Sequence, residues 1–142
     1  MDAWFEEDEE VFVHPRDPYR RVESLQTSRE ITITLGGETI AQTSKAVLLL
    51  ETGLPHRYYL PKKDVRLAFL RPSETVTRCP YKGEAHYYSV TIGNETYTDL
   101  AWYYRYPTPG LANLANYICF PQGKVECYVD GALEPRPRSR WD

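Results

Sequence analysis

The sequence predicts an all-β fold, a sandwich or open barrel of antiparallel strands with one short helix. Three observations lead to this class: β-branched and apolar segments recur at close spacing, two short glycine turns join pairs of them, and only residues 111–117 have helical character. The 142 residues suffice for one domain with one core. We expect an extended N-terminal arm over 1–28, a single β domain over 29–131 and an extended tail over 132–142.

The predicted arm and tail differ from the middle of the chain in composition. An acidic run, Glu6 to Glu10, is followed by Pro15 and Pro18, which interrupt regular helix. At the other end, Pro and Arg alternate over residues 135–140, a pattern typical of an extended segment without a core of its own.

The first predicted strands form a hairpin. Apolar and Thr residues alternate over 31–35, and the Gly36-Gly37 pair then leads into residues 38–42. Two adjacent glycines supply the positive φ angles of a tight primed turn.

Four further segments follow the first hairpin. The segment 45–50, with a continuous apolar run after Lys45, is typical of a strand buried on both faces, and 58–60 is a strand that Pro61 ends. Residues 64–70 fit either a strand or a short helix, and the β-branched segment 75–79 fits an extended strand.

A second hairpin is predicted over residues 85–92 and 95–104, with Gly93-Asn94 as its turn. In a regular ladder Tyr87 lies opposite Leu100 and Ala85 opposite Trp102, because paired positions keep a fixed sum. One face then carries small residues opposite large aromatic ones, which leaves a hollow beside Trp102. That face comprises Gly83, Ala85, Tyr87, Leu100, Trp102 and Tyr104.

The helical segment at 111–117 spans about two turns. Strands are predicted after it at 118–120 and 125–129.

Charge and motif content exclude several classes of protein. Seventeen basic against twenty acidic residues give a net charge of −3, which argues against a general nucleic-acid binder. The longest apolar run, 46–50, is far short of the ~20 residues of a membrane helix, and the N-terminus is acidic rather than basic as in a signal peptide. We expect a protein without nucleic-acid or membrane partners.

Metal, disulfide and cofactor signatures do not occur in the sequence. The three cysteines form no CxxC pair, and the three histidines, His14, His56 and His86, lie far apart in the chain. The common glycine-rich phosphate loops and hydrolase motifs are also missing. We expect no metal, no cofactor and a reduced, cytoplasmic setting.

Aromatic residues are unusually frequent. Twelve Tyr, three Trp and four Phe fit the wall of a binding pocket, where rings with a polar tip offer both apolar surface and hydrogen bonds. They fit equally a sandwich whose core is rich in Tyr.

The segment from Glu51 to Pro61 places a carboxylate after a predicted strand, and Arg57 and Tyr59 at the start of the next. At the mouth of an aromatic hollow, Glu51 could transfer protons as an acid or base. An ordinary ion pair between Glu51 and Arg57 is the alternative.

The turn Cys79-Pro80-Tyr81-Lys82-Gly83 places a thiol and an ammonium group together. Lys82 is suited to contact an anion or a carbonyl, since Gly83 lets a ligand approach the backbone closely. Cys79 is either a nucleophile assisted by Lys82 or an inert buried thiol.

Several motifs resemble domain-of-unknown-function family 427, which sequence collections also label nucleotidyltransferase-like. They are E-x(3)-P-x(2)-YY-x-P-x(2)-DV from residue 51, T-x-CPYKG-x-A-x-Y from residue 77, AW-x-Y-x(2)-P from residue 101, and Asp130-Gly131. The resemblance spans roughly residues 29–131. It implies an Mss4-like fold of coiled antiparallel sheets, although the two zinc-binding CxxC knuckles frequent in that group are missing. The family's recurrent polar and aromatic positions present here are Glu51, Tyr59, Asp64, Cys79, Lys82, Tyr87, Trp102 and Tyr104.

We expect a cofactor-free small-molecule domain, either a binding protein or a weak acid–base catalyst of the isomerase, cyclase or hydrolase type. Glu51, Lys82 and Cys79 are the candidate catalytic groups. The ligand is expected to be aromatic or apolar with an anionic or carbonyl group. Its expected binding residues are Arg57, Tyr59, Asp64, Tyr87, Trp102 and Tyr104. A self-associating interaction module, including a homodimer, and a nucleotide-binding domain remain alternatives.

Overall fold

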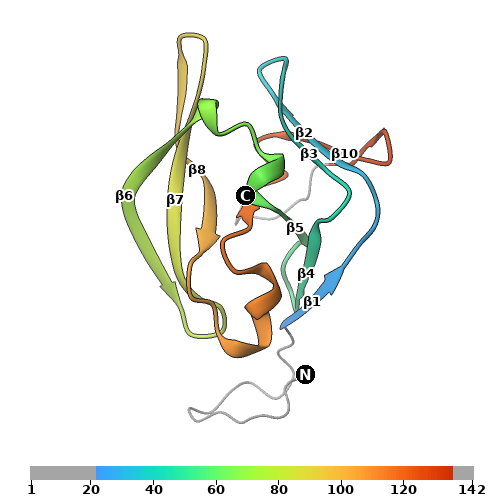
Figure 1. The fold of residues 1–142 in the computed structure, drawn as a ribbon, viewed down its shortest axis with the longest axis vertical. Coiled ribbons are helices and arrows are strands. Elements are labelled where there is room, and N and C mark those ends of the chain that lie inside the picture. The colour runs from blue at the N-terminus through green and yellow to red at the C-terminus, as the bar shows by residue number, and fades with distance from the viewer. Residues whose placement is uncertain (1–21, 136–142) are drawn as a thin grey trace.

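Two antiparallel sheets account for most of residues 22–135, the part of the chain that this computed structural model describes (Figure 1). The seven-stranded sheet has the order β1 (Val22–Gln26), β4 (Val47–Glu51), β5 (Arg57–Leu60), β9 (Ile118–Cys119), β8 (Glu95–Tyr104), β7 (Gly83–Ile92) and β6 (Leu70–Cys79). The four-stranded sheet has the order β11 (Ala132–Leu133), β10 (Glu126–Val129), β2 (Ile31–Leu35) and β3 (Glu38–Thr43). The predicted all-β class is confirmed, and the sheets do not close into a barrel.

Both predicted hairpins form. Gly36 and Gly37 turn β2 into β3 with φ of +59° and +84°, and Gly93 begins the turn from β7 to β8 with φ of +59°. Residues with a side chain rarely adopt these angles, which is why the glycines of the two turns predicted the hairpins.

The boundaries of the predicted arm and tail differ from the structure. Residues 22–26 lie within the expected arm, yet they form strand β1 and pair with β4 along its length. Ala132–Leu133, in the expected tail, pairs with β10. The acidic run and the alternating Pro and Arg residues lie outside the described residues.

The predicted helix is a 3₁₀ helix, η3, which covers Pro109–Leu114 and so begins and ends earlier than expected. Asn116 stops it, because its φ of +65° is not helical and its N–H donates to the carbonyl oxygen of Tyr104 at 2.8 Å. The ambiguous stretch at 64–70 contains parts of two more 3₁₀ turns, η1 (Lys62–Asp64) and η2 (Leu67–Phe69).

The predicted register of the second hairpin is wrong beyond its turn. Ile92 pairs with Glu95 as expected, but Tyr87 pairs with Trp102 in place of Leu100 because of an irregularity between Tyr88 and Val90. The shift amounts to two residues, so side-chain parity is kept and Tyr87 and Trp102 still share a face. Leu100 does not, and it packs in the core between the sheets.

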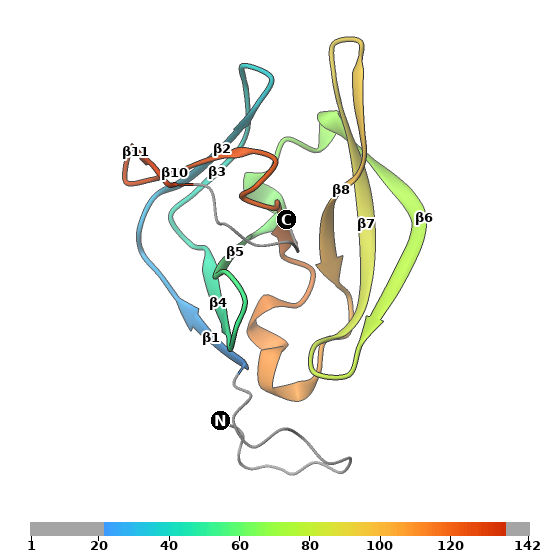
Figure 2. The same cartoon turned by 180° about the vertical axis from the view of Figure 1, so that it is seen from behind.

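The large sheet is buried on both faces, which divides the apolar side chains into two clusters. One face packs against the small sheet through residues such as Leu60, Val90 and Ile118. The other face is covered by Leu111 and Leu114 of η3, which lies between the two halves of the bent large sheet (Figures 1 and 2). The candidate site belongs to this second face.

Candidate functional site

A row of paired residues crosses the large sheet on the face that η3 covers. Tyr87 pairs with Trp102, Trp102 with Cys119, Cys119 with Tyr59, and Tyr59 with Val47. Directly paired positions on one face bring side chains into contact. The row therefore explains how aromatic residues from strands that are distant in sequence come together.

Trp102 is the centre of the aromatic group. Its indole Nε1 donates a hydrogen bond to the Tyr59 hydroxyl at 3.0 Å, and the Tyr87 ring lies 6.3 Å from its own between centroids. The guanidinium carbon of Arg57 lies 5.3 Å from the indole centroid, a cation–π distance. Burial raises the pKa of Tyr59 well above its usual value, so this hydroxyl stays neutral.

Glu51 and Lys82 form an ion pair between two distant parts of the large sheet. The Lys82 Nζ lies 2.8 Å from Glu51 Oε1, and the side chains are 16% and 4% exposed respectively. Glu51 ends β4, whereas Lys82 lies in the turn between β6 and β7. The pair therefore links the two halves of the bent sheet.

The backbone of the turn that carries Lys82 is held by the segment after β8. The Thr108 N–H donates to the Lys82 carbonyl oxygen at 3.1 Å, and the Thr108 hydroxyl donates to that of Tyr81 at 2.9 Å. Gly83 has φ of +117°, and a Cβ there would meet the Tyr106 carbonyl oxygen at 3.1 Å. Only glycine fits this close approach without displacement.

Burial and neighbouring charges set the protonation states of Lys82 and Tyr104. Burial acts to lower the pKa of Lys82, but Tyr104 and the Glu51 carboxylate outweigh it, and the pKa is raised overall. Burial also raises the pKa of Tyr104 to about 12. At neutral pH Lys82 is therefore an ammonium and Tyr104 a neutral phenol.

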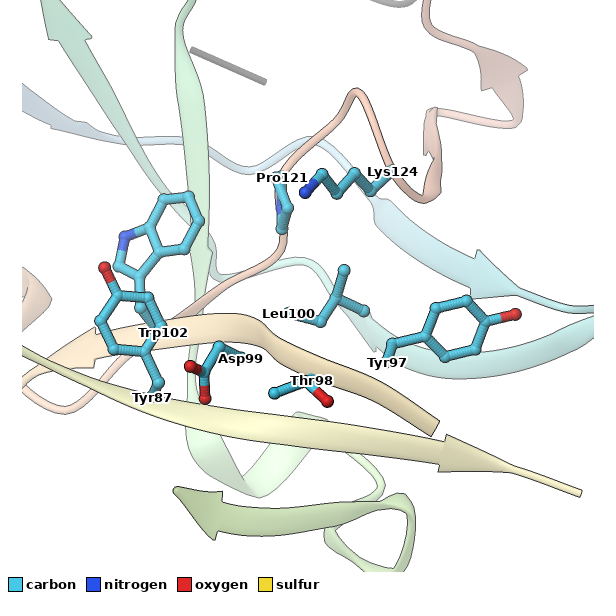
Figure 3. Close-up of a pocket in the computed structure, with 8 residues that line it drawn as sticks. All are labelled: Tyr87, Tyr97, Thr98, Asp99, Leu100, Trp102, Pro121 and Lys124. Carbon is cyan, nitrogen blue, oxygen red and sulfur yellow. The ribbon is translucent and has the colours of Figure 1, made fainter. Parts of the chain in front are cut away.

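A cavity of about 470 Å³ lies beside Trp102, and most of its wall comes from β8 and from the loop after β9 (Figure 3). Its lining residues are Tyr87, Tyr97, Thr98, Asp99, Leu100, Trp102, Pro121 and Lys124. Glu51, Lys82 and Cys79 are not among them. The lining shares Tyr87, Leu100 and Trp102 with the face on which a hollow was expected from the sequence, and its charged residues are Asp99 and Lys124.

Asp99 lies at the irregularity in the second hairpin. Its φ of +54° is in the left-handed region, which Asp tolerates better than most residues. The backbone N–H donates to Ser89 Oγ at 3.0 Å, and Oδ2 accepts from Thr75 Oγ1 at 2.6 Å. The hydroxyls of Ser73 and Thr75 lower the pKa of Asp99, so the carboxylate is ionised at neutral pH.

The predicted site residues fall into three places. Glu51, Lys82 and Tyr104 form the ion-pair group, with Cys79 in the same turn as Lys82. Arg57, Tyr59, Tyr87 and Trp102 form the aromatic group. Asp64 lies apart from both in η1, where it accepts a hydrogen bond from Thr43 Oγ1 at 2.7 Å.

Sequence reasoning missed the charged residues of the cavity. Asp99 lies within a predicted strand and Lys124 between two predicted strands, and neither was among the expected site residues. The local signal for Asp99 was its residue type, since Asp is one of the few non-glycine residues that adopt positive φ at a bulge. No local signal marks Lys124, because its place at the cavity depends on how the loop after β9 crosses β8.

Neither a metal cluster nor a membrane helix occurs in the described part of the chain. No three His, Cys, Asp or Glu side chains gather among residues 22–135 in a way that could hold a metal ion. None of the helices in this range has the length and apolar character needed to cross a bilayer.

These features define an all-β domain of two antiparallel sheets with a small aromatic-walled cavity on β8. Residues 23–131 match the family model described as domain of unknown function (DUF427), which is most of the chain, and the protein belongs to that family. The resemblance inferred from the sequence motifs is therefore confirmed. No curated protein matches the chain.

Proposed function

We propose that the domain binds a small aromatic molecule in the cavity beside Trp102, without a cofactor. The observation that carries this proposal is the cavity itself, whose volume of about 470 Å³ lies within the range of ordinary ligand sites. Rings of Tyr87 and Trp102 and the apolar side chains of Leu100 and Pro121 supply most of the contact surface.

For Glu51 and Lys82 we propose a structural role in place of the acid–base catalysis that the sequence led us to expect. These groups lie 2.8 Å apart and do not line the cavity, so each meets the other rather than a ligand. We propose that they position the aromatic group: by linking the halves of the large sheet they fix the row in which Trp102 pairs with Cys119. Binding, rather than turnover, is the function that this geometry supports best.

The indole N–H of Trp102 offers a specific probe of binding. We propose titrating the ¹⁵N-labelled chain with a library of small aromatic fragments and following the three indole signals, with Trp102→Phe identifying the relevant one. Ligands of this cavity should shift the Trp102 signal, because the ring lines the cavity while its N–H bonds Tyr59.

Two variants on the same strand separate cavity binding from surface binding. Thr98→Trp places a large ring in the cavity wall and should abolish the shifts. Thr96→Trp, also on an exposed position of β8 but outside the lining, should leave them unchanged. Fragments that bind equally well to both variants, or no fragment that moves the Trp102 signal, would contradict the proposed function.

Adding Mg-ATP to the same titration tests the alternative that the domain binds a nucleotide. Light scattering of the full chain tests the alternative that it forms a homodimer. Leu25 and Leu133 are exposed apolar side chains that a self-association surface could use. The Mss4-like relationship implied by the sequence motifs and a cytoplasmic location also remain proposals. The thiols of Cys79 and Cys127 fit a reducing compartment.

A further inference from the structure

Resting on the proposed function, we propose that the ligand of the cavity is an aromatic molecule with a single carboxylate, and that Lys124 is the residue that binds this carboxylate. The sequence led us to expect an anionic or carbonyl group and pointed to Lys82 as its contact. In the structure the Lys82 ammonium is bonded to Glu51 at 2.8 Å and does not line the cavity, whereas Lys124 does.

The aromatic wall offers ring surface rather than hydrogen bonds. The Trp102 N–H is already bonded to the Tyr59 hydroxyl at 3.0 Å, and the Tyr87 hydroxyl lies 3.0 Å from Thr77 Oγ1. With their polar atoms engaged by protein groups, these two residues select for an apolar or aromatic body. Polar selectivity must then come from the charged residues of the lining.

Asp99 offers no contact to a ligand, although it belongs to the lining. Its Oδ2 accepts a hydrogen bond from Thr75 Oγ1 at 2.6 Å, and its Oδ1 is shielded from solvent. Its negative charge still acts through space, so Asp99 and Lys124 together give the lining no net charge. This balance favours a ligand group with one negative charge over a phosphate with two.

Lys124 offers an ammonium group that the described part of the chain leaves available. Its side chain is exposed and forms no hydrogen bond or ion pair with any residue of 22–135. Figure 3 shows its amino group extending beside Pro121 toward the Trp102 end of the cavity. A carboxylate bound there can pair with the ammonium while the ring of the same ligand contacts Trp102.

The loop that carries Lys124 has a fixed backbone. The N–H groups of Lys124 and Val125 both donate to the Pro121 carbonyl oxygen, at 3.0 and 3.2 Å. Pro121 and Val125 are themselves buried. The buried side chain of Gln122 donates from Nε2 to Glu134 Oε1 at 3.2 Å. Because the backbone is held, only the side chain of Lys124 has to be ordered when an anion binds.

Three fluorinated probes that share one ring test the charge of the ligand. They are 3-(4-fluorophenyl)propionate, its neutral analogue 3-(4-fluorophenyl)propionamide, and 2-(4-fluorophenyl)ethylphosphonate, which is doubly charged at about pH 8. In ¹⁹F NMR titrations of the full chain at that pH, the propionate should bind about threefold more tightly than the propionamide, as expected for an exposed ion pair. The phosphonate should bind no more tightly than the propionate.

Two lysine variants locate the contact. Lys124→Gln should weaken binding of the propionate about threefold and leave binding of the propionamide unchanged, because Gln keeps a long polar side chain without the charge. Lys63→Gln removes the same charge from an exposed position outside the lining and should change neither. The preference for the propionate should shrink in high salt.

The outcomes distinguish this inference from the proposed function. If the propionate binds no more tightly than the propionamide, or if Lys124→Gln weakens it no more than Lys63→Gln, the carboxylate assignment is wrong; the cavity function stands where Thr98→Trp still abolishes the binding of fragments. Tighter binding of the phosphonate would overturn the carboxylate in favour of a doubly charged group. If Thr98→Trp cancels no binding of any probe, and no fragment moves the Trp102 indole signal, both proposals are wrong.

Discussion

Breaking the Glu51–Lys82 ion pair should destabilise the protein far more than breaking an exposed pair of the same length. Because the Glu51 side chain is only 4% exposed, Lys82→Met removes an ammonium group from contact with a buried carboxylate. Removing one member of a buried pair typically costs ~3–5 kcal/mol. We expect about 3 kcal/mol, at the lower end, because Lys82 is 16% exposed and its attraction to Glu51 is partly screened.

The converse variant should cost less. Glu51→Gln leaves the ammonium of Lys82, whose flexible side chain can turn toward water, so we expect about 2 kcal/mol. The double variant removes both charges of the pair, and the loss should be about 3 kcal/mol rather than the sum of the two. The coupling between the residues is therefore expected to be about 2 kcal/mol.

The same hairpin provides a matched control. Arg78 and Glu84 also lie 2.8 Å apart, but their side chains are 79% and 40% exposed. Arg78→Met should cost less than about 0.5 kcal/mol. Urea unfolding at pH 7, followed by tryptophan fluorescence, gives the free energy of unfolding for all five proteins. Additive losses for Glu51 and Lys82 within ~0.5 kcal/mol, or equal losses for Lys82→Met and Arg78→Met, would refute the reasoning.

Three further predictions concern titration, thiol reactivity and backbone geometry. Burial raises the pKa of Tyr104 from 10 to about 12, so the free energy of unfolding should fall as the pH rises from 10 to 12. Tyr104→Phe should remove up to about 2.7 kcal/mol of that fall, as measured by unfolding experiments across this pH range. Iodoacetamide should modify Cys79 well before Cys127, because Cys127 is buried and its pKa is raised to about 12; equal rates by mass spectrometry would contradict this. Gly83→Ala should cost at least about 1 kcal/mol more than Gly93→Ala, since a Cβ meets a carbonyl oxygen at 3.1 Å only at the former.

Turns and strand types could be predicted from the sequence because their causes are local. Gly36-Gly37 and Gly93-Asn94 determine their hairpins through positive φ, and the alternation of Ile and Thr in β2 matches its alternating burial. The order of strands in the large sheet has no such local cause. Strand β9 lies between β5 and β8, and β1 pairs with β4, through contacts between distant segments.

The register error shows how one residue limits a geometric prediction. A regular ladder places Leu100 opposite Tyr87, whereas the irregularity near Asp99 puts Trp102 there. Trp102 thereby joins the row with Cys119 and Tyr59, and its N–H reaches the Tyr59 hydroxyl. Tyr87 was nevertheless correctly expected on the same face as Trp102, because a shift of two residues preserves side-chain parity.

The expected acid and amine lie together in one place, and the cavity lies in another. Glu51 and Lys82 neutralise each other within the fold, which suits a contact that holds the sheet together. Asp99 at the bulge and Lys124 in the loop after β9 belong to the lining of the cavity, to which neither member of that pair contributes. The ammonium of Lys82 and the carboxylate of Glu51 would have to separate before either could bind a ligand. We therefore expect substitutions of Glu51 and Lys82 to change mainly the stability of the fold, and substitutions in the cavity lining, such as Thr98→Trp, to change mainly ligand binding.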